Sequence, residues 1–175
     1  MVTLPDEVKD RVLSYIKHQA AKSAPALRDV VQHGHDQVTG LLAGMSDEQA
    51  SFKPSAEEWS VFQVLQHAAE AGRRTARGCV ALATGEEANK IEGPGQIRNE
   101  PFTSLDQARA ALDAGHQELL DFLDSLSPEM NIEATLDHPF FGPLNCREWA
   151  AFQRIHDGDH AGQIEQITSA AGYPA

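Results

Sequence analysis

The sequence predicts an all-α protein, a bundle of four helices of about 20 residues each with a short extra helix at its N-terminus. Apolar residues recur every three or four positions in four long segments. Polar capping residues precede three of these segments. No alternating run of polar and apolar residues is long enough to predict a strand. We therefore expect one helical domain over residues 1–175, with residues 1–24 as an N-terminal extension.

Two helices are predicted in the first quarter of the chain. Residues 5–20 have apolar side chains at helical spacing, and Pro5 stands where a first helical turn tolerates proline. Pro25 interrupts this pattern. A long helix then runs over residues 27–43 and ends at Gly44, which is a suitable C-terminal cap.

The next core helix is predicted over residues 60–83. Ser60 and Gln63 form a capping box at its start, and Gly85 follows its end. Its core-facing stripe has small residues near its middle, including Gly72. We expect a neighbouring helix to approach closely there.

Two further core helices follow an irregular stretch at residues 84–103, which we expect to flank a functional site. Ser104 with Gln107 caps a helix that ends before Pro128. A turn-rich connection leads to a last helix that starts after Asn145 and reaches Ile167.

Composition and charge exclude several classes of function. The net charge is -12 and the pI about 5.0, which disfavours nucleic acid as a partner because its binding needs clustered Lys and Arg. The N-terminus has no apolar signal core, and no run of about 18 apolar residues predicts a membrane span. Cys79 and Cys146 form no paired motif, and Cys146 is expected to be a small packing residue. A cytoplasmic protein fits these features.

Two histidines interrupt the core stripe of the last helix. His156 and His160 are four residues apart, so they project from one face one turn apart. His67 lies in the middle of the second core helix, beside its apolar stripe. Three histidines from two helices are a typical ligand set for a catalytic metal ion. The alternative is a pair of polar residues on the helix flank, or a hydrogen-bonded core histidine.

The stretches "EEWSVFQVLQHAAEA" and "HPFFGPLNCREWAAFQRIHDGDHAGQIEQI" resemble the DinB superfamily, which includes the YfiT-like proteins. The resemblance spans residues 59–167. It implies a four-helix bundle in up-down-down-up order, usually a homodimer, and a divalent metal such as zinc or nickel. By the same resemblance, the metal ligands are His67, His156 and His160.

Other polar residues have two interpretations each. Glu70, on the helix of His67, is a candidate general base or a hydrogen-bond partner for a ligand, unless it pairs with a neighbouring arginine. Asp157 and Asp159 are expected to point to the flanks of the last helix, where Asp159 is either exposed or supports a metal ligand. His35 and His116 lie on or beside core stripes and are candidates to line the same pocket as the metal site.

The sequence supports two functional hypotheses. In the first, the protein is a metal-dependent enzyme that activates a water or a low-molecular-weight thiol toward a small-molecule substrate, as a hydrolase or a thiol S-transferase. The superfamily that the sequence resembles includes thiol-dependent transferases and isomerases. In the second, the protein is a non-catalytic, stress-associated module that binds a metal or another small ligand.

Overall fold

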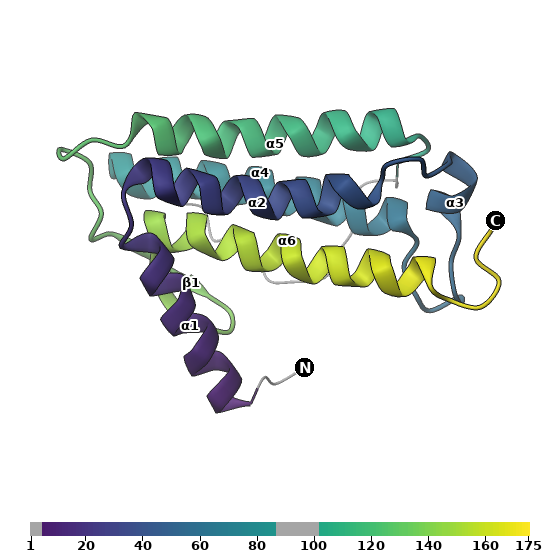
Figure 1. The fold of residues 1–175 in the computed structure, drawn as a ribbon. Helices are drawn as coiled ribbons and strands as arrows, with labels where there is room; N and C mark the ends of the chain where they lie inside the picture. The colour runs from purple at the N-terminus through teal and green to yellow at the C-terminus, as the bar shows by residue number, and fades with distance from the viewer. Residues whose placement is uncertain (1–4, 87–101) are drawn as a thin grey trace.

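The computed structural model describes residues 5–86 and 102–175, which form a long bundle of helices with a small β-hairpin on one side (Figure 1). The described elements, in chain order, are α1 (Asp6–Ala20), α2 (Ala24–Leu41), α3 (Asp47–Ser51), α4 (Val61–Thr84), α5 (Leu105–Ser125), β1 (Thr135–His138), β2 (Gly142–Asn145) and α6 (Cys146–Thr168). None of the helices in these ranges is long and apolar enough to cross a membrane.

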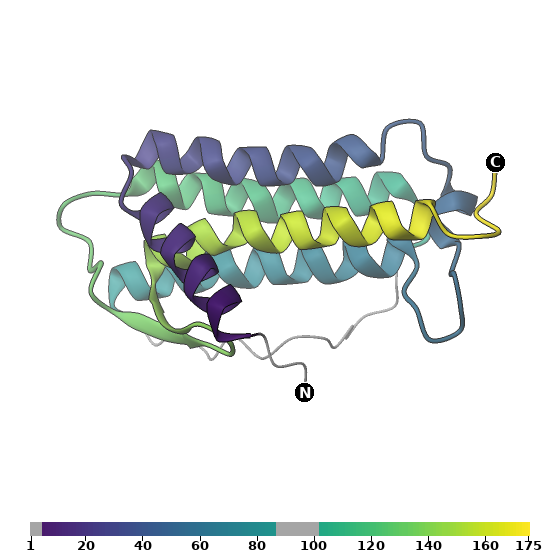
Figure 2. The same cartoon turned by 60° about the horizontal axis from the view of Figure 1, so that its bottom comes forward.

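The four long helices run in the predicted up-down-down-up order. In Figures 1 and 2, α2 and α6 run in one direction, and α4 and α5 run in the opposite one. Around the bundle, α4 packs against α5 and α6, and α2 packs against the same two helices. Residues 87–101 of the predicted loop at residues 84–103 lie outside the described residues.

The predicted starts of α4 and α6 are confirmed by their side-chain caps, whereas α2 begins at Ala24, three residues before its predicted start. The Ser60 and Asn145 side chains accept hydrogen bonds from backbone amides of the first turns of α4 and α6. In both capping boxes the side chain of the third helical residue, Gln63 or Glu148, accepts a hydrogen bond from the backbone amide of the capping residue. Gly85 ends α4 with φ 76°, a left-handed conformation that favours glycine. A third capping box begins the short helix α3 at Ser46, within a segment predicted as linker.

The prediction of no strands was wrong at one place, where β1 and β2 pair antiparallel before α6. Each strand has only four residues, too few for a period of two to stand out. The hairpin depends on packing for its stability: Leu144 is fully buried, and the Trp149 indole of α6 donates to the Leu136 carbonyl at 3.1 Å. Gly142, with φ 72°, supplies the turn.

The N-terminal helix α1 is held against the start of α6. Ile16 of α1 is fully buried in the same apolar cluster as Trp149. The Arg147 guanidinium donates to the Ala20 carbonyl at 2.8 Å and also to the Lys22 carbonyl, beyond the end of α1. These bonds satisfy carbonyls that the helix itself leaves unpaired.

The apolar interior is divided into two clusters, one toward each end of the bundle. Between them, the four long helices carry polar or small residues. We call His35, His116, Gln153 and Asp157 the interior polar layer. His156 lies between Gln153 and Asp157 on α6, so this predicted metal ligand borders the interior polar layer.

The predicted close approach is confirmed, but a different glycine makes it possible. A Cβ on Gly115 of α5 would lie 3.3 Å from the Arg73 backbone nitrogen and 3.4 Å from the Ala69 carbonyl oxygen of α4. A Cβ on Gly72 would meet Gln153 Nε2 at an ordinary 3.7 Å. The α4–α5 contact therefore depends on the missing side chain of Gly115.

Candidate metal centre

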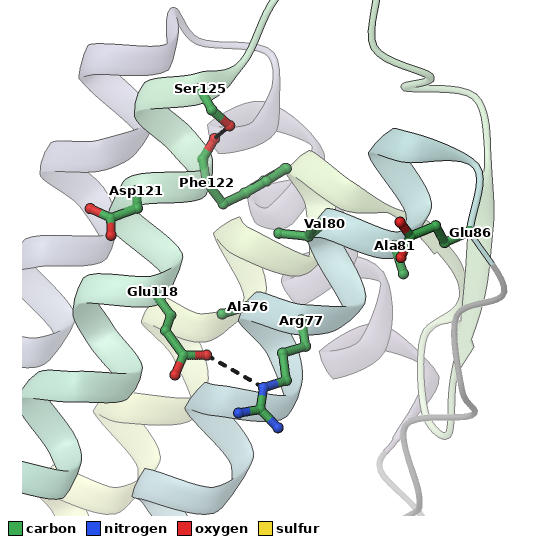
Figure 3. A pocket seen from close by; sticks show the side chains of 9 residues that line it. All are labelled: Ala76, Arg77, Val80, Ala81, Glu86, Glu118, Asp121, Phe122 and Ser125. Atoms are coloured by element: carbon green, nitrogen blue, oxygen red, sulfur yellow. Dashed lines mark hydrogen bonds and ion pairs between the residues drawn. The ribbon is translucent and has the colours of Figure 1, made fainter.

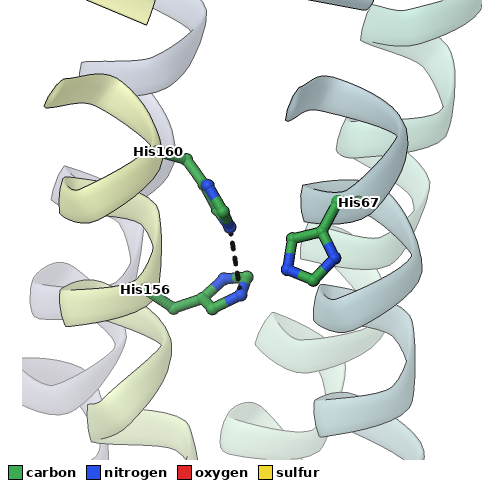
Figure 4. A group of neighbouring side chains, drawn as sticks. All are labelled: His67, His156 and His160. Carbon is green, nitrogen blue, oxygen red and sulfur yellow. Dashed lines mark hydrogen bonds between the residues drawn. The ribbon is translucent and has the colours of Figure 1, made fainter. Parts of the chain in front are cut away.

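The structure brings the three predicted histidines together across the contact between α4 and α6 (Figure 4). His67 projects from α4, and His156 and His160 project from successive turns of α6. One nitrogen from each ring lies within 4.8 Å of the other two. Among the described residues, no other His, Cys, Asp or Glu forms such a group.

The spacing of these rings suits a single small cation. His156 Nε2 and His160 Nε2 are 3.1 Å apart. Two nitrogens bound to one tetrahedral ion at about 2.1 Å would lie roughly 3.4 Å apart. The His67 ring centroid is 5.4 Å from that of His156 and 5.0 Å from that of His160. The α6 pair is therefore already at about the required spacing, and a movement of His67 toward it would bring all three nitrogens to one ion.

Burial keeps these imidazoles uncharged. His67 is 8% exposed and His160 is 5% exposed. Burial, with the neighbouring His156 as a smaller cause, lowers the pKa of His67 to about 4 and that of His160 to about 3. Neutral rings retain the lone pairs that a metal ion accepts, so no proton need leave these two rings at neutral pH.

A hydrogen bond to Gln163 decides which nitrogen of His160 faces the other two histidines. Its Nδ1 is 2.9 Å from Gln163 Oε1, which can only accept, so the proton is on Nδ1 and the lone pair on Nε2. The Nδ1 atoms of His67 and His156 are buried and have no hydrogen-bond partner among the described residues.

Glu70 lies one turn beyond His67 on α4, with its side chain 14% exposed. Gln66 Nε2 donates to its Oε1 at 2.8 Å, and an Arg74 nitrogen is 3.9 Å from its Oε2. The carboxylate is close enough to oppose the lowering of the His67 pKa. Glu70 is therefore near His67 and also near an arginine, and its role as a base stays a prediction.

Aromatic rings form the walls of the histidine group. The Trp59 ring is 5.5 Å from that of His67, and the Phe152 ring is 5.9 Å from that of His156. Sequence reasoning missed His138, whose ring is 4.4 Å from that of Phe152. Burial lowers the pKa of His138 to about 4. Its only sequence signal was its place in a turn-rich connection, and the undetected hairpin positions it.

Two other predicted histidines do not join the group. The rings of His35 and His116 stack on each other at 4.0 Å, within the interior polar layer. His35 Nε2 is 2.9 Å from Asp113 Oδ1, and His116 Nε2 is 3.0 Å from Gln32 Oε1. Together with Asp157 they border a cavity of about 20 Å³, room for roughly one water molecule.

The two aspartates between the α6 histidines differ in burial. Asp159 is exposed, as expected. Asp157 is 7% exposed, a burial that the sequence analysis did not predict, and it accepts a hydrogen bond from Gln153 Nε2 at 2.7 Å. The small residue Gly34 of α2 leaves room for its carboxylate. Cys146 is fully buried, and burial raises the pKa of its thiol, which agrees with a packing role.

A cavity of about 510 Å³ lies elsewhere, between the later halves of α4 and α5 (Figure 3). An ion pair between Arg77 and Glu118 at 3.5 Å borders it, and Val80 and Phe122 supply apolar surface. No histidine or cysteine lines it within the described ranges, so it lacks the donor atoms that the α4–α6 site has.

Comparison with known sequences identifies the family of this chain and a relative. The model of the DinB superfamily matches residues 31–164, which include all three histidines. The Bacillus subtilis (strain 168) protein YuaE is 32% identical over 144 residues, which cover 72% of this chain and 87% of YuaE. Helix α1 precedes the region that the family model matches.

Solved structures share the fold. TT2238, described as a four-helix bundle protein, has a TM-score of 0.63 and 22% identity, covering 82% of this chain and 99% of TT2238. YfiT from Bacillus subtilis has a TM-score of 0.63 and 16% identity, covering 99% of this chain and 93% of YfiT. YfiT is described as a probable metal-dependent hydrolase with an unusual four-helix bundle topology.

Proposed function

The chain belongs to the DinB superfamily, and on this premise we propose that it is a metal-dependent enzyme that acts on a small molecule. His67, His156 and His160 would bind one divalent ion, with zinc and nickel as the first candidates. Such an ion lowers the pKa of a water or a thiol at an open coordination position and so supplies a nucleophile at neutral pH. The reaction would be hydrolysis or transfer to a low-molecular-weight thiol.

The number of converging ligands supports catalysis over a purely structural metal. Three imidazoles meet, and no fourth His, Cys, Asp or Glu within the described ranges completes the set. Structural zinc sites usually have four protein ligands, whereas catalytic sites keep a position open.

We also propose that the active protein is a homodimer, as the family resemblance implies.

The surrounding residues would prepare the site. Gln163 fixes the tautomer of His160, and the Trp59 and Phe152 rings exclude water from one side of the histidines. We assign Glu70 the role of general base, because Gln66 orients its carboxylate beside His67.

Metal content tests the site directly. Protein incubated with zinc or nickel and then desalted should retain about one ion per chain. His156→Ala should retain far less, and the matched control His18→Ala, which alters an exposed histidine of α1, should bind as the wild type does. Wild-type protein that stays metal-free would refute the site. A bound ion whose shell is closed by a fourth protein side chain would favour the non-catalytic module instead.

Activity tests the role of Glu70. The zinc and nickel forms would be assayed for hydrolysis of a nitrophenyl ester and, with glutathione, for conjugation to a chloronitrobenzene. Glu70→Gln keeps the shape and should lower kcat by about 10²-fold or more with unchanged metal content. Equal rates for the two proteins would exclude Glu70 as the base.

A further inference from the structure

A third cavity, of about 210 Å³, lies between the segment before α4 and the last turns of α6. We call it the Trp59 pocket. Its polar lining comes from Glu58, Gln163 and Gln166, and its apolar lining includes Trp59, Val64 and Ile167. Nothing in the metal-centre proposal uses this cavity.

Two residues belong both to the Trp59 pocket and to the surroundings of the histidines. Trp59 lines the pocket, and its ring is 5.5 Å from that of His67. Gln163 also lines the pocket, and its Oε1 accepts from His160 Nδ1 at 2.9 Å. That bond leaves the amide nitrogen of Gln163 available to a molecule in the pocket. A molecule bound there would therefore contact two residues that also neighbour the histidines.

The lining determines which charge the pocket accepts. Glu58 is the only ionisable residue among the described residues that line it. Lys53, nearby in the same loop, donates its ammonium group to the Ala56 carbonyl at 3.2 Å and does not line the pocket. A carboxylate and an indole that line the same pocket are a favourable environment for an organic ammonium group. An anionic group would meet only repulsion from Glu58.

The size of the pocket limits how much of a ligand it holds. Pockets that enclose a whole drug-sized ligand have volumes of about 300–1,000 Å³. A cavity of 210 Å³ is smaller, so it fits one end of a molecule. The amides of Gln163 and Gln166 would bond to hydroxyl or amide groups next to the ammonium.

We propose that the Trp59 pocket binds an ammonium-bearing end of the substrate while the reacting end lies at the metal centre. This inference rests on the proposed function, because it assumes that the metal centre acts on a small molecule. The substrate class is thus a small organic cation with hydrogen-bonding groups beside the charge. The pocket itself needs no metal, so its binding can be measured separately.

Choline is a suitable probe because its quaternary ammonium group cannot bind a metal ion. Its uncharged isostere, in which a carbon atom replaces the nitrogen, is the control ligand because it differs from choline only in charge. Titrations would follow tryptophan fluorescence in chelator-treated protein. The chain has two tryptophans, and Trp149 is only 2% exposed, so the response should come from Trp59 and disappear in Trp59→Phe.

We expect choline to saturate the signal and to bind at least about fivefold more tightly than the isostere. Glu58→Gln should remove this preference, and Glu57→Gln, a change of the neighbouring exposed carboxylate, should preserve it. His156→Ala should bind choline as the wild type does while losing the metal. Equal binding of the two ligands, or an unchanged preference in Glu58→Gln, would overturn the proposal. Choline binding by a protein that takes up no metal would refute the proposed function and the placement of the reacting end, and it would leave only the ammonium site in the Trp59 pocket.

Discussion

The interior polar layer makes the protein sensitive to acid through His116. Burial, with a smaller contribution from His35, lowers the pKa of the His116 ring from 6.5 to about 4. Between these two values the unfolded chain binds more protons than the folded one. The stabilising effect of the neutral ring is therefore complete above pH 6.5 and is lost as the pH falls toward 4.

The size of the effect follows from the two pKa values. At about pH 5, an unfolded pKa of 6.5 and a folded pKa of about 4 correspond to a loss of about 2 kcal/mol in the free energy of unfolding. The ring is only partly buried, and solvent screens its charge, so we expect about 1 kcal/mol. His116→Gln removes the titrating group and keeps a side chain that can bond to Gln32.

Urea unfolding of chelator-treated protein at about pH 8 and pH 5 would measure this difference. The wild type should lose about 1 kcal/mol more than His116→Gln between the two conditions. The control His18→Gln, which removes an exposed histidine from α1, should follow the wild-type curve. Equal losses in the wild type and His116→Gln would show that the buried ring does not cause the acid sensitivity.

Two further predictions concern the metal centre and the helix packing. Gln163→Ala removes the acceptor for His160 Nδ1 and should weaken zinc binding by about 10-fold in a chelator competition, whereas Gln166→Ala should leave the affinity unchanged. An effect of the same size in both variants would contradict a role in orienting His160. Gly115→Val places a side chain against the α4 backbone and should cost about 1–3 kcal/mol in urea unfolding. Gly162→Ala on α6, with open space around the new Cβ, should stabilise slightly, and similar stabilities of these two variants would refute the packing argument.

The helices and their ends were predictable because their signals are local. A capping box such as Ser60 with Gln63 is complete within four residues, and the period of apolar residues extends over each helix. The hairpin escaped prediction because its four-residue strands are stabilised by α6, and no pattern within the strands records that contact. The burial of Asp157 was missed for the same reason, since the space for it is left by Gly34 on another helix.

The sequence by itself determined the helical class, the family and the spacing of His156 and His160 on one face, because these depend on residues close together in the chain. Only the tertiary structure decided that His67 reaches that pair and that His35 and His116 stack apart from it. It also decided that Trp59 and Gln163 border both the histidines and a second pocket. The physical reason is that the packing of α4 against α6 sets the distances between their side chains, and a sequence pattern gives only the face from which each side chain projects.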